Sequence, residues 1–139
     1  MHGERIYDGL VTAKEVLREW HIDADLVTLS ACESGLGKEI GGEGIVGFAH
    51  AFFQAGARSL LVSLWRVDDR ATSLLMQRFY ENVTGGYLDT RGGRTAAPMS
   101  KADALREAKS WLHGYRTANG RAPYAHPSYW SPFVLIGGR

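Results

Sequence analysis

Residues 26–35 read LVTLSACESG, and Cys32 stands where an apolar run gives way to a turn through glycine. The continuously apolar or small run over residues 26–31 predicts a strand buried on both faces, as in a parallel sheet covered by helices. In open parallel sheets, ligands gather where strands end in loops. Cys32 is the single cysteine among 139 residues and cannot form an internal disulfide. Its thiol therefore either packs in the interior or reacts.

Helical and strand patterns alternate on both sides of this run. Capping-box spacing and apolar periodicity predict a first helix over about residues 13–20, with Val16, Leu17 and Trp20 on its apolar face. The other expected elements are a helix through residues 45–53 that stops at Gly56, a strand over 59–64, a helix capped by Asp68 or Asp69 and ended near Gly85, a helix capped by Ser100 that continues to Tyr115, and a strand over 133–136. Polar, glycine-rich loops are expected over about 84–99 and 116–128.

This order of elements predicts an α/β fold. Strands that alternate with helices imply βαβ crossovers and a mostly parallel sheet covered on both sides. The 139 residues are about one domain long. Three strands make a thin sheet with an apolar edge, and such an edge favours pairing with more chain. We therefore expect the chain to be the C-terminal portion of a larger sheet.

Composition excludes several classes of protein. The net charge is +1 and no basic block is present, which argues against a nucleic-acid partner. No apolar run approaches the ~20 residues that span a bilayer, so no membrane association is expected. A lone cysteine fits a reducing, cytoplasmic location. The Gly37-Lys38 pair is not a phosphate-binding loop, because that motif requires glycine where Cys32 stands.

Two interpretations of Cys32 remain open from the residues alone. Free cysteine is often a small buried hydrophobe. As a nucleophile it would need a base, usually histidine, and backbone N–H groups aimed at the developing oxyanion. Asp68 and Asp69 follow the second strand; one aspartate suffices as a helix cap, and Asp69 could line a substrate pocket that favours a basic side chain.

The histidines and aromatic residues favour structural roles. None of the five histidines has metal-ligand spacing with Cys32, so no metal is expected. His50 is expected on a helix flank, His21 and His113 near helix C-termini, and His126 in a turn; His2 precedes Gly3. The aromatic group Trp65, Tyr129, Trp130 and Phe133 is expected to pack in the core or at its rim.

Taken together, six segments resemble the CHAT domain, a caspase-like cysteine peptidase family often attached to TPR repeats in bacteria. The matching segments are residues 8–13 (DGLVTA), 25–37 (DLVTLSACESGLG), 42–48 (GEGIVGF), 55–59 (AGARS), 63–69 (SLWRVDD) and 126–137 (HPSYWSPFVLIG). They cover nearly the whole chain and are specific in combination. The resemblance implies a caspase-like α/β/α sandwich that cleaves peptide bonds with a Cys–His dyad and needs no cofactor.

The resemblance also assigns roles to individual residues. Cys32 matches the family nucleophile, and Asp69 is similar in position to the acidic pocket residue of separases, related peptidases with arginine specificity. The family histidine lies in a His-Gly pair that closes an earlier strand, whereas no strand pattern precedes His2-Gly3. We expect the true histidine upstream of Met1. The implied partners are a peptide or protein substrate, the upstream half of the domain, and TPR repeats.

Two functions follow. The first is a cysteine endopeptidase whose histidine-bearing half is not in this chain. The second is a catalytically inactive interaction module that docks through its open sheet edge.

Overall fold

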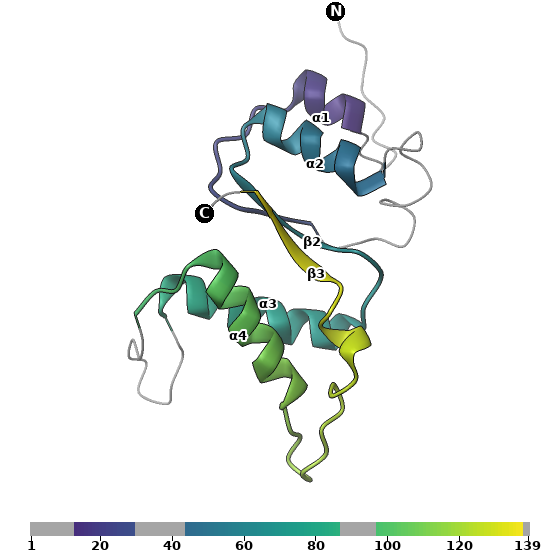
Figure 1. Ribbon diagram of the computed structural model, residues 1–139, viewed down its shortest axis with the longest axis vertical. Coiled ribbons are helices and arrows are strands. Elements are labelled where there is room, and N and C mark those ends of the chain that lie inside the picture. Colours follow the sequence, from purple (N-terminus) through teal and green to yellow (C-terminus); the bar gives the residue numbers. More distant parts are fainter. Residues whose placement is uncertain (1–12, 30–43, 87–96, 138–139) are drawn as a thin grey trace, which may run out of the picture.

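A computed structural model describes residues 13–29, 44–86 and 97–137 (Figure 1). Its elements are α1 (Ala13–Glu19), β1 (Val27–Leu29), α2 (Gly44–Ala55), β2 (Ser59–Ser63), α3 (Asp69–Thr84), α4 (Lys101–His113), the 3₁₀ helix η1 (Pro127–Tyr129) and β3 (Phe133–Gly137). The predicted order of helices and strands is confirmed, and so is the α/β class.

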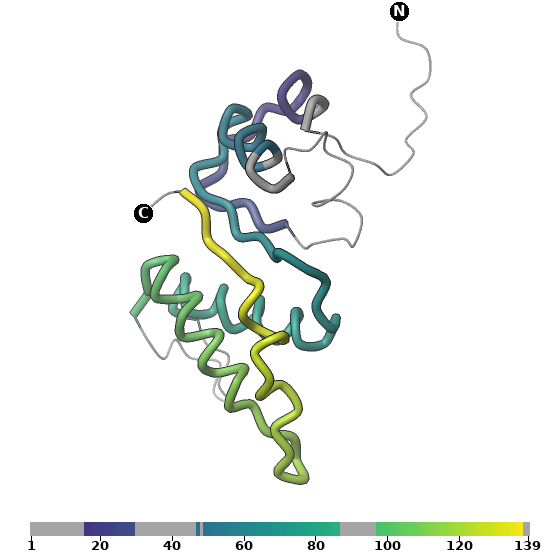
Figure 2. Tube along the Cα trace, turned by 45° about the vertical axis from the view of Figure 1, so that its right-hand side comes forward, coloured from purple at the N-terminus to yellow at the C-terminus, as the bar shows by residue number. Residues whose placement is uncertain are grey.

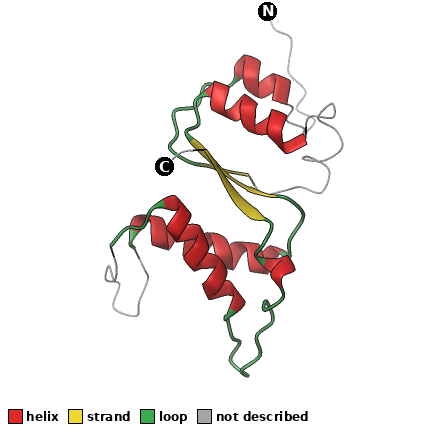
Figure 3. Cartoon of the chain, in the orientation of Figure 1, coloured by secondary structure: helices red, strands yellow, loops and turns green. Residues whose placement is uncertain are grey.

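The elements form three layers, with the sheet between two pairs of helices. Figure 3 shows α1 and α2 on one face of the strands and α3 and α4 on the other. Because side chains alternate along a strand, β2 supplies both cores. Leu61 packs with α3 and α4, whereas Leu60 and Val62 pack with α1 and α2. The three side chains are at most 1% exposed.

The strand order is β1-β2-β3, with β2 in the middle. Strands β1 and β2 are parallel, with Leu29 opposite Val62, whereas β2 and β3 are antiparallel, with Ser63 opposite Phe133. One of the two pairings in the described sheet is therefore antiparallel, and the prediction of a mostly parallel sheet is wrong there. A single crossover helix returns the next strand in parallel, but two successive helices, α3 and α4, reverse it. Figure 2 shows β3 passing between the two helical layers.

Strand β1 differs from its prediction in burial. All three of its residues are partly exposed, because β1 lies at an edge of the described sheet and has β2 on one side. Two contacts hold it against the α3–α4 layer. The Thr28 hydroxyl hydrogen-bonds that of Tyr80, and the Lys101 Nζ atom lies 2.7 Å from a carboxylate oxygen of Asp25.

Helix ends follow the expected capping chemistry. The Asp68 side chain accepts a hydrogen bond from the backbone N–H of Ala71, so Asp68 is the N-cap of α3. Gly85, at φ 71°, ends the same helix in the left-handed conformation that glycine adopts without strain. Ser100 caps α4 by accepting from the N–H of Asp103.

A polar cluster joins α3 to α4 within their shared apolar surface. Arg78 binds both carboxylate oxygens of Glu107, at 2.8 and 3.0 Å. The buried Asn82 amide donates to the same carboxylate and to the Ala104 carbonyl. The hydrogen bonds from Arg78 hold the pKa of Glu107 below its usual range, with a smaller contribution from Asn82. The cluster fixes how the two helices pair.

Replacing Glu107 with glutamine should destabilise the fold at neutral pH by about 1 kcal/mol, since the ion pair is partly exposed. A carboxyl group whose folded pKa is lowered contributes stability above its unfolded pKa and loses it as the pH falls through the folded pKa. The difference between wild type and Glu107→Gln should therefore shrink below about pH 4. Urea unfolding at neutral and acid pH measures it.

Asp103→Asn is the matched control, because Asp103 forms an exposed ion pair with Arg106 on the same helix. It should change the free energy of unfolding by a few tenths of a kcal/mol. A Glu107→Gln effect of that small size, or one independent of pH, would contradict the role assigned to the cluster.

Candidate functional site

Three strand ends meet at one end of the sheet. Leu29 closes β1 beside Val62, and Ser63 closes β2 opposite Phe133, where β3 begins. The carboxyl ends of parallel β1 and β2 therefore lie next to each other. This is the edge of an open sheet where ligand sites are usually built.

Residues 64–69, which we call the strand-end rim, connect β2 to α3 at this place. The backbone N–H of Leu64 donates to the Pro132 carbonyl at 3.0 Å, and the Trp65 indole N–H donates to the Ser128 carbonyl at 3.3 Å. These bonds tie the rim to the segment that enters β3. Leu64 and Trp65 nevertheless remain 48% and 47% exposed. The rim thus offers apolar surface next to charged side chains.

A shallow depression of about 360 Å³ is lined by Arg66, Val67, Asp68 and Asp69. The Asp68 carboxylate caps α3 by accepting a hydrogen bond from the Ala71 N–H. Asp69 is the first residue of α3 and is exposed. A carboxylate at this position can meet a cation that enters the depression. The structure therefore brings Asp69 to the sheet end at which Cys32 was predicted to act.

Other predicted site residues fall outside the described ranges. These are Cys32, most of the glycine-rich loop over 35–44, and the His2-Gly3 pair. Cys32 follows the last residue of β1, Leu29, by three positions in the sequence.

The described histidines have structural or surface positions. His50 is exposed on α2, and His21 is exposed beyond the end of α1. His126 caps η1, because its Nδ1 atom accepts from the Ser128 N–H at 3.2 Å. His113 ends α4 and packs edge-on against Trp130. Among residues 13–29, 44–86 and 97–137, no group of three or more metal-binding side chains occurs.

The predicted aromatic packing is largely confirmed. Phe133 is fully buried, and Tyr129 and Trp130 pack against the α3–α4 core. Trp65 is the exception, since nearly half of it is exposed at the strand-end rim. Tyr124 also lies near this rim: desolvation raises the pKa of its hydroxyl, and the negative charge of Asp68 adds to the rise.

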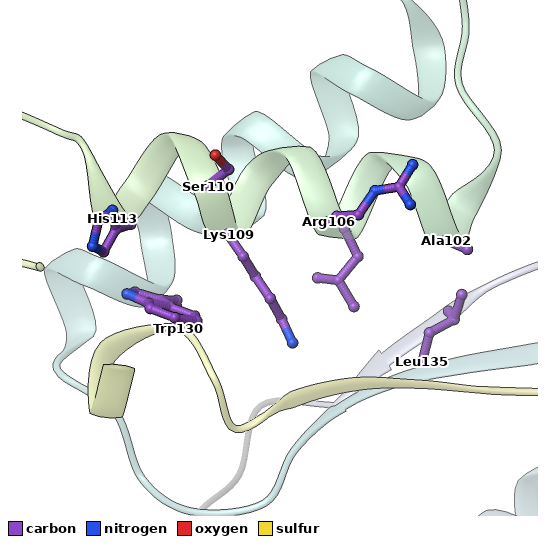
Figure 4. A pocket seen from close by; sticks show the side chains of 8 residues that line it. Ala102, Arg106, Lys109, Ser110, His113, Trp130 and Leu135 are labelled. Carbon is purple, nitrogen blue, oxygen red and sulfur yellow. The ribbon is translucent and has the colours of Figure 1, made fainter. Parts of the chain in front are cut away.

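Sequence reasoning missed a surface between α4 and β3. A groove of about 650 Å³ runs between α4 and the segment around β3 (Figure 4). Its basic residues are Arg106, Lys109 and His113. Their spacing of three and four positions places them on one helix face, a signal that was present in the sequence. No helix in the described part of the chain is long and apolar enough to cross a membrane.

The chain folds as a three-layer α/β domain. At the carboxyl ends of its parallel strands, the strand-end rim forms a surface of the kind that binds ligands in open sheets. The family profile of the CHAT domain matches residues 1–138, and the chain belongs to that family.

Two relatives carry the name Tetratricopeptide repeat protein 28, one from Mus musculus and one from Homo sapiens. Each is 29% identical to this chain over 128 residues. The matched part is 92% of this chain and 4% of each relative, so the chain corresponds to a small fraction of their length. No solved structure matches the chain significantly. These relatives are mammalian, and the expected bacterial association remains a prediction.

Proposed function

We propose that the chain is the nucleophile-bearing part of a caspase-like cysteine endopeptidase domain. The observation that carries the proposal is the adjacency of the carboxyl ends of β1 and β2, one leading to Cys32 and the other to Asp69. Cys32 follows the end of β1 by three positions in the sequence. Membership in the CHAT family supports the same assignment.

In the proposed reaction, the Cys32 thiolate attacks the carbonyl carbon of a peptide bond and forms a C–S bond. The C–N bond breaks, and a histidine that we place upstream of this chain protonates the departing amine. Water then cleaves the thioester, which releases the carboxylate product and returns the thiol. Backbone N–H groups of the turn after β1 would stabilise the oxyanion.

The whole protein is proposed to contain more than this domain. Both relatives are named for tetratricopeptide repeats and are far longer than this chain. We place such repeats, and the histidine-bearing half of the sheet, in the same polypeptide. A cytoplasmic location belongs to the same proposal, on the ground that Cys32 is the single cysteine.

Selective alkylation tests the proposal in the longer protein. Iodoacetamide should modify Cys32 with a pH midpoint well below the ~8.5 of a free thiol. Peptide cleavage should fall in proportion to the modification of Cys32, which mass spectrometry can localise. Cleavage that persists after complete modification of Cys32 would exclude it as the nucleophile.

Asp69 should determine preference for a basic side chain before the cleaved bond. Replacing it with asparagine removes the charge and should lower kcat/KM for arginine-containing substrates about 10- to 100-fold, the worth of one charge-assisted hydrogen bond. Asp68→Asn is a close control: asparagine still caps α3, but the depression loses one charge. An equal effect of both variants would show that general charge, not Asp69, matters.

A second function remains: a catalytically inactive module that docks through the exposed side of β1. The partial exposure of all three β1 residues favours it. Amide hydrogen exchange of the 139-residue chain tests it, because an available strand edge exchanges quickly and becomes protected when a partner pairs with it. Full protection of Val27–Leu29 in a monomeric chain would exclude this docking mode.

A further inference from the structure

The groove between α4 and β3 has a mainly apolar floor and a basic wall. Leu105, Trp130 and Leu135 contribute the apolar surface, and all three belong to or pack against the α3–α4 core. Figure 4 shows the α4 side chains along one wall, with Trp130 and Leu135 facing them. The lining of this α4–β3 groove shares no residue with the depression at Asp69.

The wall carries positive charge without a negative counterpart in the groove. Arg106, Lys109 and His113 line it, and the lining contains no Asp or Glu. Arg106 is 81% exposed, and its ion pair with Asp103 is a surface contact of small value. Burial alone lowers the pKa of Lys109, and no opposite charge among the described residues offsets that desolvation. A negatively charged occupant would be complementary to this wall.

Trp130 contributes a buried indole to one end of the groove. Its indole N–H is buried and has no hydrogen-bond acceptor among the described residues. Leaving such a donor unsatisfied costs about 1–3 kcal/mol. The same side chain lines the groove beside His113.

Strand β3 adds a backbone surface. It pairs with β2 on one side and is the last strand in the described sheet, so its other edge has no strand partner there. Leu135, in the middle of β3, also lines the groove. An extended peptide that pairs with this edge would hold every second side chain toward one face, next to the groove.

We propose that the α4–β3 groove binds an extended acidic peptide segment of a partner protein, which adds a strand to β3 and places carboxylates against Arg106, Lys109 and His113. An acidic residue at every second position suits the site, because alternate side chains of an added strand face the basic wall and the intervening ones point to the other face of the sheet. The proposal concerns recognition of a partner and does not depend on cleavage by Cys32.

Fluorescence anisotropy with the 139-residue chain and labelled ten-residue peptides tests it. A peptide of alternating Glu and Val should bind at least about 10-fold more tightly than the corresponding Gln–Val peptide. Binding of the Glu–Val peptide should weaken as salt rises from about 0.05 to 0.5 M, because the partly exposed charges are screened. Equal affinity for the two peptides would overturn the proposal.

Variants locate the binding surface. The double substitution Arg106→Gln and Lys109→Gln should weaken Glu–Val binding about 5- to 30-fold. Arg18→Gln is the control, since Arg18 is an exposed cation on α1, on the opposite face of the sheet. An Arg18→Gln effect as large as that of the double variant would show that net charge alone attracts the peptide.

Two further measurements separate strand addition from other occupants. A Glu–Val peptide N-methylated at alternate residues should lose about 10-fold or more in affinity in one of its two registers, because methylation removes the pairing N–H groups. Unchanged affinity in both registers would overturn strand addition. Sedimentation that finds a dimer dissociated by Lys109→Gln would also overturn the proposal, because a second copy would then fill the groove.

Discussion

Replacing Cys32 with alanine should lower peptide cleavage by the longer protein at least about 1,000-fold. Alanine removes the atom that forms the acyl-enzyme, and loss of the nucleophile in enzymes of this kind leaves only the contribution of substrate binding and oxyanion stabilisation. Substrate affinity should change little, so the loss should appear in kcat. Cleavage of a labelled peptide under saturating substrate measures it.

The control for this prediction is the stability of the same variant. A reactive cysteine at a strand end contributes little packing, so Cys32→Ala should keep the urea midpoint of the parent protein. A large drop in the midpoint with cleavage retained would instead identify Cys32 as a core residue, the alternative that its residue type left open. Unchanged cleavage would contradict the endopeptidase assignment outright.

Gly56→Ala should destabilise the domain by at least about 3 kcal/mol, which places it among the most damaging substitutions in the chain. Gly56 connects α2 to β2 at φ 119°, a backbone conformation that alanine adopts only with strain. An added Cβ would also lie 1.7 Å from the Ile22 carbonyl oxygen. The backbone must shift to relieve this overlap, and Ile22 is itself bonded to α2 through the Ala55 carbonyl.

Gly120→Ala separates backbone strain from the overlap between the added Cβ and the Ile22 carbonyl. Gly120 also has a positive φ, 83°, but a Cβ there would meet nothing within 4 Å. This variant should cost only the backbone strain, about 1–2 kcal/mol. Urea unfolding of both variants, monitored by circular dichroism, gives the comparison. Equal losses would mean that the contact with Ile22 adds nothing.

Local sequence signals predicted the helices and strands well. Asp68 and Ser100 have the side chains that cap helices, and Gly56 and Gly85 have the freedom that ends them. These signals act over a few residues, so they can be recognised without the tertiary structure. The alternation of elements likewise fixed the α/β class, because each strand needs helices to cover its two faces.

Properties that depend on neighbours far along the chain were harder to predict from the sequence. The apolar run of β1 suggested burial on both faces, but burial depends on sheet position, and β1 is at an edge. Leu17 was expected on a buried helix face and is 50% exposed. The antiparallel direction of β3 follows from the pair α3 and α4, which the predicted order already contained.

The candidate site was predicted in part. Asp69 lies at the predicted end of the sheet, and Asp68 caps the helix as one of the two aspartates was expected to do. The exposed Leu64 and Trp65 were not expected, since their apolar character alone suggested packing. The α4–β3 groove required knowledge of which segment faces α4, and that depends on the fold.

The central position of β2 has a consequence for how the domain folds. Its residue Ser59 pairs with Gly137, so the fully buried middle strand completes its pairing only when β3, far along the chain, is present. Such distant pairing gives high contact order, which slows folding. During synthesis one edge of the apolar strand β2 stays unpaired until β3 has left the ribosome. In that interval the nascent domain is exposed to aggregation, and its productive folding should depend on chaperones more than that of a helical domain of equal length.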